Sequence, residues 1–191
     1  MRKLNILITG HTHGIGKSLF QYLSKENNVT GIARTIDKKN KEKQFKCDVS
    51  DYKALKKVFS KIKKIDVLIN NAGVAKYSSN EIKNFDKIVK INLNGVYYCS
   101  KLGINKLKNS LSPRIINISS INAYQAFPNN PGYIASKGGV LSLTRSLALD
   151  CQKNKINVNS ISLGYFKTKM TIKSYKNKVE YEKRKKRTIL K

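Results

Sequence analysis

The chain has 191 residues, of which 40% are hydrophobic, and this length is sufficient for one sizeable buried core. The composition is that of a globular domain and excludes a disordered or fibrous protein. The formal net charge of +28 would attract polyanions such as nucleic acid, membrane headgroups or phosphorylated ligands, but it identifies none of them.

Lysines and arginines are spread over every segment, and only 183–187 form a continuous basic run. We interpret this run as a solvated face, with an anionic partner as the alternative. Because the remaining basic residues are scattered, we expect no specific nucleic-acid partner.

The cysteines and the N-terminal segment indicate the cellular setting. Cys47, Cys99 and Cys151 are far apart, odd in number and without CxxC spacing, so they predict neither a disulfide framework nor a zinc site. The first apolar stretch stops at Thr9, too early for a signal peptide, and no later run is long enough to span a membrane. We therefore expect a cytoplasmic protein without a membrane partner.

Short β-branched runs alternate with amphipathic segments along the chain, which is typical of an α/β fold. The expected architecture is a single domain, 1–191, with a doubly wound parallel sheet of Rossmann type and helices on both faces. Strands are expected at 4–9, 29–33, 44–47, 66–70, 114–119 and 157–162.

Helical patterns occur between these strands. One passes through Leu19 and Leu23, and another follows Ser50 as its N-cap, with apolar residues at helical spacing as far as Ile62. Residues 85–107 indicate a longer region of one or two helices. Residues 133–149 are apolar on more than one side, which indicates burial against the sheet and allows contact with a partner subunit. A basic tail with helical character is expected at 173–191.

The first strand is followed directly by a glycine-rich turn, Thr9-Gly10-His11-Thr12-His13-Gly14-Ile15-Gly16. Its glycines allow a sharp turn, a close approach of the backbone to a pyrophosphate and tight packing of the next helix. Backbone N–H groups and the helix dipole would then hold the phosphates. His11 and His13 lack further ligands for a metal, so we expect no metal site and predict that both histidines line the turn.

The end of the second strand predicts which dinucleotide is bound. An acidic residue about twenty positions after the glycine turn would bond the adenosine ribose, whereas an arginine suits a 2′-phosphate. The strand ends in Ile32-Ala33-Arg34, and Asp37 lies further out among lysines. We therefore expect NADP(H) rather than NAD(H), with a simple exposed cation as the alternative interpretation of Arg34.

Tyr133 and Lys137 form a candidate catalytic pair because residues four apart lie on the same face of a helix. A nearby ammonium group favours the phenolate and lowers the phenol pKa from about 10. The tyrosine can then exchange a proton as a hydride arrives at or leaves a carbon. Ser120 ends a strand at the edge where α/β sheets bind ligands, and its hydroxyl can polarise a carbonyl. A surface pair is the alternative for Tyr133 and Lys137.

These features resemble the short-chain dehydrogenases/reductases, in the short single-domain branch with 3-oxoacyl-acyl-carrier-protein reductase-like members. The resemblance covers nearly the whole chain and begins with the spacing of the glycine turn. The other motifs occur in the family order: Cys47-Asp48-Val49, Asn70-Asn71-Ala72-Gly73, Asn92 within Ile91-Asn92-Leu93-Asn94-Gly95, Ser120, Tyr133 with Lys137, and Gly164 with Thr168.

The resemblance implies an NAD(P)(H)-dependent oxidoreductase that moves a hydride between the nicotinamide and a carbonyl or alcohol carbon of a small substrate. It makes Tyr133 the general acid/base and Ser120 the group that orients the carbonyl. Lys137 would lower the tyrosine pKa and bond the nicotinamide ribose, and Asn92 would anchor a proton relay through water. The implied cofactor-binding residues, besides Tyr133 and Lys137, are Gly10, Thr12, His13, Gly14, Ile15, Gly16, Arg34, Asp48, Val49, Asn70, Ala72, Gly73, Phe166 and Thr168.

Two departures from the family pattern affect the C-terminal part. Leu163-Gly164 stands where the family usually has Pro-Gly, and the chain ends at Lys191 where relatives continue through another helix and a last strand. The resemblance therefore implies that part of the family fold is missing, with a subunit contact and part of the substrate pocket. Relatives are commonly homodimers or homotetramers, so a homo-oligomer is expected of the full-length protein.

Three hypotheses are compatible with the sequence: an active NADP(H)-dependent reductase, a truncated and inactive dinucleotide-binding protein, and a nucleic-acid-binding protein driven by charge. The catalytic residues argue against the second, and the scattered lysines argue against the third. A sugar, an acyl thioester and a steroid-like ketone all stay open as substrates. The pocket is expected to be shaped by 121–132 and the region after Gly164, with Tyr124, Phe127 and Tyr165 as apolar walls.

Overall fold

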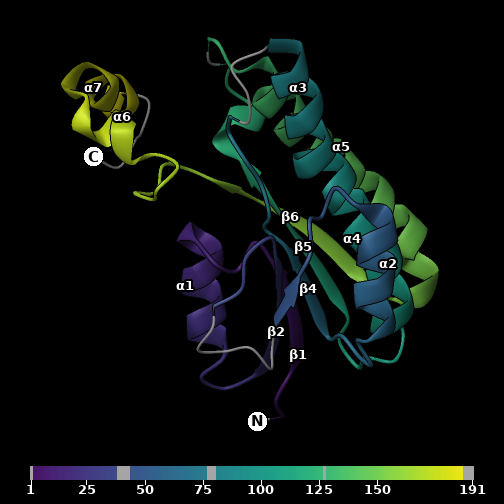
Figure 1. Cartoon of the computed structure of the whole chain (residues 1–191). Coiled ribbons are helices and arrows are strands. Elements are labelled where there is room, and N and C mark those ends of the chain that lie inside the picture. The colour runs from purple at the N-terminus through teal and green to yellow at the C-terminus, as the bar shows by residue number, and fades with distance from the viewer. Residues whose placement is uncertain (1, 38–43, 77–80, 127, 187–191) are drawn as a thin grey trace.

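The computed structural model describes residues 2–37, 44–76, 81–126 and 128–186. Within these residues, six parallel strands form one sheet in the order β3-β2-β1-β4-β5-β6 (Figure 1). The strands are β1 (Asn5–Thr9), β2 (Asn28–Ala33), β3 (Gln44–Lys46), β4 (Val67–Asn70), β5 (Arg114–Ser120) and β6 (Asn157–Leu163). Each strand lies within one residue of its predicted bounds. The chain order reverses between β1 and β4, which creates a crevice at their carboxyl ends.

Helices cover both faces of the sheet, which confirms the predicted doubly wound fold (Figure 1). Helix α1 (Gly14–Leu23) lies on one face, and α2 (Tyr52–Ser60), α4 (Gly95–Leu107) and α5 (Pro131–Cys151) pack together on the other. Helix α3 (Glu81–Val89) continues into α4 through a π-helical turn at Lys90–Asn94. The region predicted at 85–107 is therefore two helices that begin four residues earlier, at Glu81.

The C-terminal helices α6 (Ile172–Lys176) and α7 (Lys178–Lys186) pack against each other and project from the end of β6 (Figure 1). They agree with the expected helical character of the basic tail up to residue 186. Side chains 183 and 184 and residue 187 of the predicted basic run lie outside the described residues. None of the helices that the structure describes is long and apolar enough to cross a bilayer.

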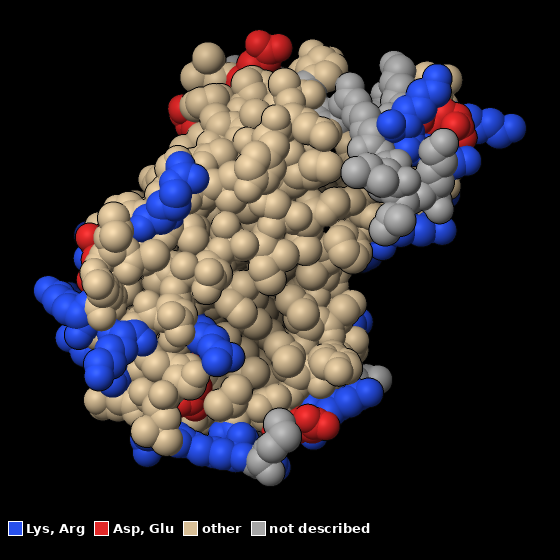
Figure 2. Space-filling view, turned by 180° about the vertical axis from the view of Figure 1, so that it is seen from behind, with Lys and Arg blue, Asp and Glu red and all other residues tan. Residues whose placement is uncertain are grey.

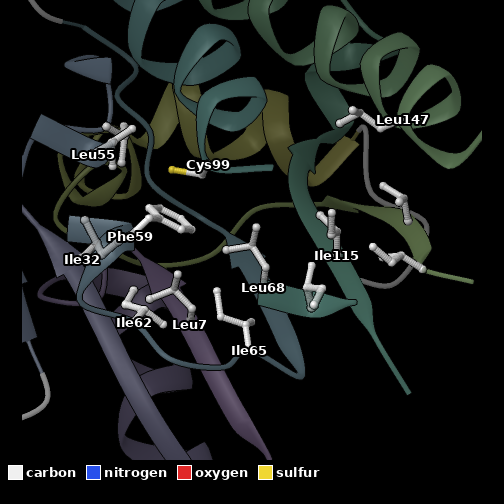
Figure 3. Close-up of a cluster of buried hydrophobic side chains, with 14 of the residues drawn as sticks. Leu7, Ile32, Leu55, Phe59, Ile62, Ile65, Leu68, Cys99, Ile115 and Leu147 are labelled. Atoms are coloured by element: carbon white, nitrogen blue, oxygen red, sulfur yellow. The ribbon is translucent and has the colours of Figure 1, made fainter. Parts of the chain in front are cut away.

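The alternation of side chains along β1 divides the core into two clusters. Leu7 packs with residues of α2, α4 and α5, including Leu55, Phe59 and Cys99 (Figure 3), whereas Ile6 and Ile8 pack with Phe20 of α1. This follows from the period of two in a strand, which sends neighbouring side chains to opposite faces. Each fully buried aliphatic side chain contributes about 1.5–3 kcal/mol, so both faces of the sheet stabilise the crevice above it.

The N-cap of α2 is Asp51, and the prediction of Ser50 is wrong by one residue. The Asp51 carboxylate accepts a hydrogen bond of 3.0 Å from the Ala54 N–H. The Ser50 hydroxyl instead donates to Asp48 Oδ1 at 2.7 Å and accepts from Lys87 Nζ at 3.4 Å.

Candidate active site

A cavity of about 670 Å³ lies along the carboxyl ends of the strands. This volume is within the range of roughly 300–1,000 Å³ that is usual for small-molecule sites. All but two of the predicted site residues border it: Gly10, Thr12, His13, Gly14, Ile15, Gly16, Arg34, Asp48, Val49, Ala72, Gly73, Ser120, Tyr133, Lys137, Phe166 and Thr168. The two exceptions are Asn70 and Asn92.

The glycine turn forms one end of the cavity, and two of its glycines are required by geometry. Gly10 has a φ of +72°, and a Cβ at this position would lie 2.8 Å from the Ala72 Cα. A Cβ on Gly16 would lie only 2.2 Å from the Gly10 carbonyl oxygen. The turn thus brings its backbone closer to its neighbours than any other residue type allows.

The N-terminus of α1 opens toward this turn. Its N-cap is His13, whose side chain makes no capping hydrogen bond, and His13, Gly14, Ile15 and Gly16 all border the cavity. The first N–H groups of a helix lack partners within the helix and, together with the helix dipole, favour an anion. The turn and helix therefore fit the phosphates of a dinucleotide.

His11 corrects the prediction that both histidines line the turn. His13 borders the cavity, but His11 does not. The His11 ring is 2% exposed, and its centroid lies 5.0 Å from the Phe20 ring beneath the turn.

Thr9 and Asn71 brace the glycine turn, although no motif assigned either of them a role. Asn71 Nδ2 donates to the carbonyl oxygens of Thr9 and Gly10 at 3.0 and 3.2 Å. The Thr9 hydroxyl accepts hydrogen bonds of 3.0 Å from the N–H groups of both Asn71 and Ala72. The missed signal is the strand period. The Asn70 side chain, at the end of β4, points toward α4. Because neighbouring side chains of an extended segment point in opposite directions, the Asn71 side chain points toward the glycine turn.

Asn70 lies in a buried polar network on the face of the sheet that α4 and α5 cover, and it does not border the cavity. Its Nδ2 donates to Ser100 Oγ at 3.0 Å and to Asn117 Oδ1 at 2.8 Å. Asn117 in turn donates to Thr144 Oγ1 at 3.0 Å. These bonds link β4 and β5 to α4 and α5, so the geometry favours a structural part for Asn70 over the predicted contact with the cofactor.

Arg34, Asp48 and Val49 border the cavity where β2 and β3 end. Burial opposes ionisation of Asp48, but the Ser50 N–H and hydroxyl both donate to its carboxylate. With the cations of Lys87 and Arg34 nearby, these bonds hold the pKa of Asp48 below its ordinary value. This part of the cavity therefore presents a fixed carboxylate beside an exposed guanidinium.

Ser120, Tyr133 and Lys137 meet at the other end of the cavity. Ser120 is the last residue of β5, while Tyr133 and Lys137 lie one turn apart near the start of α5. The Ser120 side chain is hydrogen-bonded to the Tyr133 oxygen, and Lys137 Nζ lies 5.8 Å from the centre of the Tyr133 ring. The structure thus brings the predicted trio into one compartment with the glycine turn.

The ionisation of the trio differs from the prediction. Burial raises the pKa of Tyr133, although a hydrogen bond from Ser120 to the phenolate works in the opposite direction. Burial also lowers the pKa of Lys137 to about 8, and Lys137 Nζ donates to the Ile118 carbonyl oxygen at 2.7 Å. Of the two effects on Tyr133, burial is the larger and the Ser120 hydrogen bond the smaller, so the pKa of Tyr133 lies above its ordinary value.

Asn92 holds the backbone that follows Gly73. It lies in the π-helical turn and is fully buried, with Oδ1 accepting from the Val74 N–H at 2.8 Å and Nδ2 donating to the Val74 carbonyl at 2.9 Å. A Cβ on Gly73 would lie 3.2 Å from Asn92 Oδ1 and 3.7 Å from Lys137 Nζ. Asn92 and Lys137 thus both lie beside Gly73, and the part of Asn92 in a proton relay stays a prediction.

The last residue of β6 and the segment after it form an apolar part of the cavity lining. Leu163, Phe166 and Met170 border the cavity. Tyr124 is 73% exposed, and neither it nor Tyr165 borders the cavity, so their prediction as pocket walls is wrong. Phe127 lies outside the described residues.

The basic residues do not gather on the face shown in Figure 2. Lysines and arginines lie mainly around its margins, and most of its centre is uncharged. This face therefore offers no continuous basic surface of the kind that phosphate backbones select.

A sequence profile described as short chain dehydrogenase matches residues 4–179. The 3-oxoacyl-[acyl-carrier-protein] reductase FabG of Buchnera aphidicola is 34% identical over 190 residues, which cover 90% of this chain and 77% of the relative. The structure of ElxO with NADP bound has a TM-score of 0.78 and 27% identity, covering 92% of this chain and 79% of ElxO. That of 4-hydroxyisoleucine dehydrogenase complexed with NADH has a TM-score of 0.84 and 26% identity, covering 95% and 81%.

Proposed function

The chain belongs to the short-chain dehydrogenase family of nicotinamide-dependent oxidoreductases, and we propose that it is an NADPH-dependent reductase of a small carbonyl substrate. One observation carries this proposal. Ser120, Tyr133 and Lys137 border the same cavity as the glycine turn, so a dinucleotide held by the turn would extend toward a proton donor.

Tyr133 is the proton donor in this proposal. When bound, the nicotinamide cofactor supplies a hydride to the carbonyl carbon, which leaves negative charge on the carbonyl oxygen. The Tyr133 hydroxyl gives its proton to that oxygen, and the Ser120 hydroxyl stabilises the developing charge by a hydrogen bond. A tyrosine with a raised pKa is protonated at neutral pH, which suits reduction rather than oxidation.

Lys137 holds the dinucleotide beside this donor. An ammonium group has three N–H donors, and one of them is bonded to the Ile118 carbonyl. The other two can donate to hydroxyl groups of the nicotinamide ribose. Phe166 and Thr168 also border the cavity and are proposed to hold the carboxamide.

The preference for NADP(H) is proposed from the Arg34 guanidinium and its polar neighbours at the adenosine end. Arg34, His13 and the Thr12 hydroxyl border the cavity there, and a guanidinium suits a phosphate better than a ribose hydroxyl. Solved relatives are named with NADP and with NADH, so the choice must be measured on this chain. A lower KM for NADPH than for NADH supports the assignment, and the reverse order contradicts it.

The substitution Tyr133→Phe tests the reaction itself, because it keeps the ring and removes only the proton. Turnover should fall by about a hundredfold to ten-thousandfold, while the dissociation constant for NADPH should change little. The matched control is Tyr124→Phe, which alters an exposed tyrosine outside the cavity and should leave both quantities unchanged. Retained turnover in Tyr133→Phe would contradict the proposal.

The apolar part of the cavity lining favours a substrate with a hydrocarbon portion. Leu163, Phe166 and Met170 provide such a surface, and the name of the Buchnera relative denotes a 3-oxoacyl thioester substrate. We propose an acyl thioester as the first substrate to test, against a sugar and a steroid-like ketone with NADPH. A higher kcat/KM for either of the other two would contradict this choice.

Three further expectations stay predictions: a single domain, a homodimer or homotetramer, and a cytoplasmic location. Light scattering of the purified chain would measure the mass of the assembly. Cofactor binding without turnover on any carbonyl substrate would instead favour the inactive dinucleotide-binding protein.

A further inference from the structure

The His11 ring lies against Gly31 of β2, in space that a larger side chain at position 31 would fill. A Cβ on Gly31 of β2 would lie 2.4 Å from His11 Cγ and Nδ1, so these two positions are matched in size. The ring packs on Phe20 on its other side. His11 is thus anchored below the glycine turn, between α1 and β2.

The carboxamide of Gln44 has an orientation that its neighbours determine. Gln44 opens β3 and is 8% exposed. Its Oε1 accepts from the Asp37 N–H at 2.8 Å, and its Nε2 donates to the Asp37 carbonyl oxygen at 3.1 Å. Because a backbone N–H only donates and a carbonyl only accepts, these bonds distinguish the amide oxygen from the nitrogen.

This orientation also determines the tautomer of His11. His11 Nε2 lies 2.7 Å from Gln44 Oε1, which is an acceptor, so Nε2 must carry the hydrogen and donate it. His11 Nδ1 is buried and has no hydrogen-bond partner among the described residues, which agrees with an unprotonated nitrogen. Gln44 Oε1 therefore accepts hydrogen bonds from both His11 of the glycine turn and Asp37 of the segment that follows β2, and links the two.

A second chain of hydrogen bonds ties the same segment to the turn. The Thr35 hydroxyl donates to Thr12 Oγ1 at 3.1 Å, and Thr12 Oγ1 lies 3.0 Å from His13 Nδ1. Segment 34–37 is thus attached through both Thr35 and Asp37. Arg34 begins this segment and borders the cavity, whereas His11 and Gln44 do not border it.

We propose that His11 and Gln44 are positioning residues that fix segment 34–37, and with it Arg34, at the adenosine end of the cavity. They thereby set the discrimination between a 2′-phosphate and a free 2′-hydroxyl. This inference rests on the proposed NADP(H) preference. A fixed backbone reduces the conformational entropy that Arg34 loses when it binds a phosphate, and so strengthens phosphate binding. The affinity for a ligand without the 2′-phosphate does not benefit, because that ligand does not engage Arg34.

The test compares two ligands that report on the adenosine end alone. Titration calorimetry measures the dissociation constants of adenosine 2′,5′-bisphosphate and adenosine 5′-monophosphate for the wild type and for Gln44→Leu. We expect the variant to bind the bisphosphate about tenfold more weakly and the monophosphate within about twofold of the wild type, as the loss of one buried hydrogen-bonded link predicts. His11→Gln keeps an N–H donor and should stay close to the wild type, whereas His11→Leu should match Gln44→Leu.

Two further variants separate positioning from general stability. Asn27→Leu removes bonds to the Leu4 N–H and the Leu23 carbonyl, away from segment 34–37, and should leave the ratio of the two dissociation constants unchanged. If Gln44→Leu does not fold, the double variant His11→Ala with Gly31→Val refills the space and still removes the link, so it should show the same tenfold loss, again about that of one hydrogen bond.

Equal weakening of both ligands would overturn the inference, because a merely structural role affects them alike. A wild type that binds both equally well would overturn it too. Neither result bears on the reaction, which the turnover of Tyr133→Phe tests separately.

Discussion

The two ends of the cavity are held in different ways. At the cofactor end, the glycine turn is bonded to residues far away in the chain, as in the hydrogen bonds between Thr9 and Asn71, which are 62 positions apart. In residues 164–171 after β6, which we call the substrate end because we propose that their apolar side chains receive the substrate, Thr171 Oγ1 bonds the Phe166 carbonyl and the Thr168 N–H, so these bonds span at most five residues. This segment also reaches the glycine turn, because a Cβ on Gly14 would lie 3.4 Å from Thr168 Cγ2. Phe166 and Met170 are about half exposed.

This difference separates a preformed site from an adjustable one. Long-range bonds to buried strands resist local opening, whereas a segment with local bonds and exposed side chains can change shape at small cost. The substrate end also leads into α6 and α7, which project from the fold (Figure 1). We therefore expect substitutions to be costly around the glycine turn and mild after Gly164.

The largest effect is expected for Gly16→Ala. Alanine in a helix normally stabilises relative to glycine by up to about 1 kcal/mol, but here the new methyl group would lie 2.2 Å from the Gly10 carbonyl oxygen. The clash should lower the free energy of unfolding by about 3 kcal/mol and weaken cofactor binding. Urea denaturation followed by circular dichroism measures the first effect. A variant as stable as the wild type would show that the turn is not closely packed.

Lys137, which lies with Ser120 and Tyr133 away from the glycine turn, should make stability depend on pH. Burial lowers its pKa from 10.5 to about 8, so between these values the unfolded chain binds a proton that the folded protein has lost. Lys137 by itself should therefore make the free energy of unfolding rise with pH across this window, by at most about 3 kcal/mol, whereas Cys47, whose pKa burial raises from 9.0 to about 11, acts in the opposite direction. The Lys137 contribution is the difference between the wild type and Lys137→Met. Lys137→Met should remove the rise and also weaken cofactor binding. Identical slopes in denaturation experiments on both proteins would show that Lys137 keeps an ordinary pKa.

A smaller loss is expected for Asn71→Leu at the cofactor end. The substitution leaves the carbonyl oxygens of Thr9 and Gly10 without the donor that Asn71 Nδ2 provides. The free energy of unfolding should fall by about 2 kcal/mol, and NADPH should bind more weakly because the turn loses its brace. Thr171→Val, which removes a hydroxyl at the substrate end, should cost less. The opposite order of these two variants would break the comparison between the ends.

The sheet and the catalytic pair were predictable because they depend on short-range patterns. The β-branched runs predicted every strand to within one residue, since alternation and burial act along a single strand. The Tyr133 and Lys137 pair follows from one helical turn. The choice of Ser50 as N-cap failed by one residue because the chain enters the helix after Asp51, whose carboxylate accepts from the Ala54 N–H, and spacing alone does not reveal this boundary.

The parts that could not be predicted depend on neighbours distant in the sequence. Asn71, rather than Asn70, braces the turn because of the face on which β4 ends, and His11 points inward because Gly31 leaves room for its ring. Whether the pKa of Tyr133 is raised or lowered depends mainly on how deeply the residue is buried. A sequence motif carries no information about burial depth. Residue types were thus predictable at the site, whereas their orientation and ionisation required the fold.

The smallest effect is expected for Gly164→Ala, the counterpart of Gly16→Ala at the substrate end. A Cβ on Gly164 would have nothing within 4 Å, and its φ is not in the left-handed region. Alanine should therefore fit without strain and raise the free energy of unfolding by about 0.5 kcal/mol, because it restricts the unfolded chain. The same urea experiment measures both glycine variants. A loss above about 1 kcal/mol in Gly164→Ala would mean that the substrate end is packed as tightly as the glycine turn, and the contrast between the two ends would not hold.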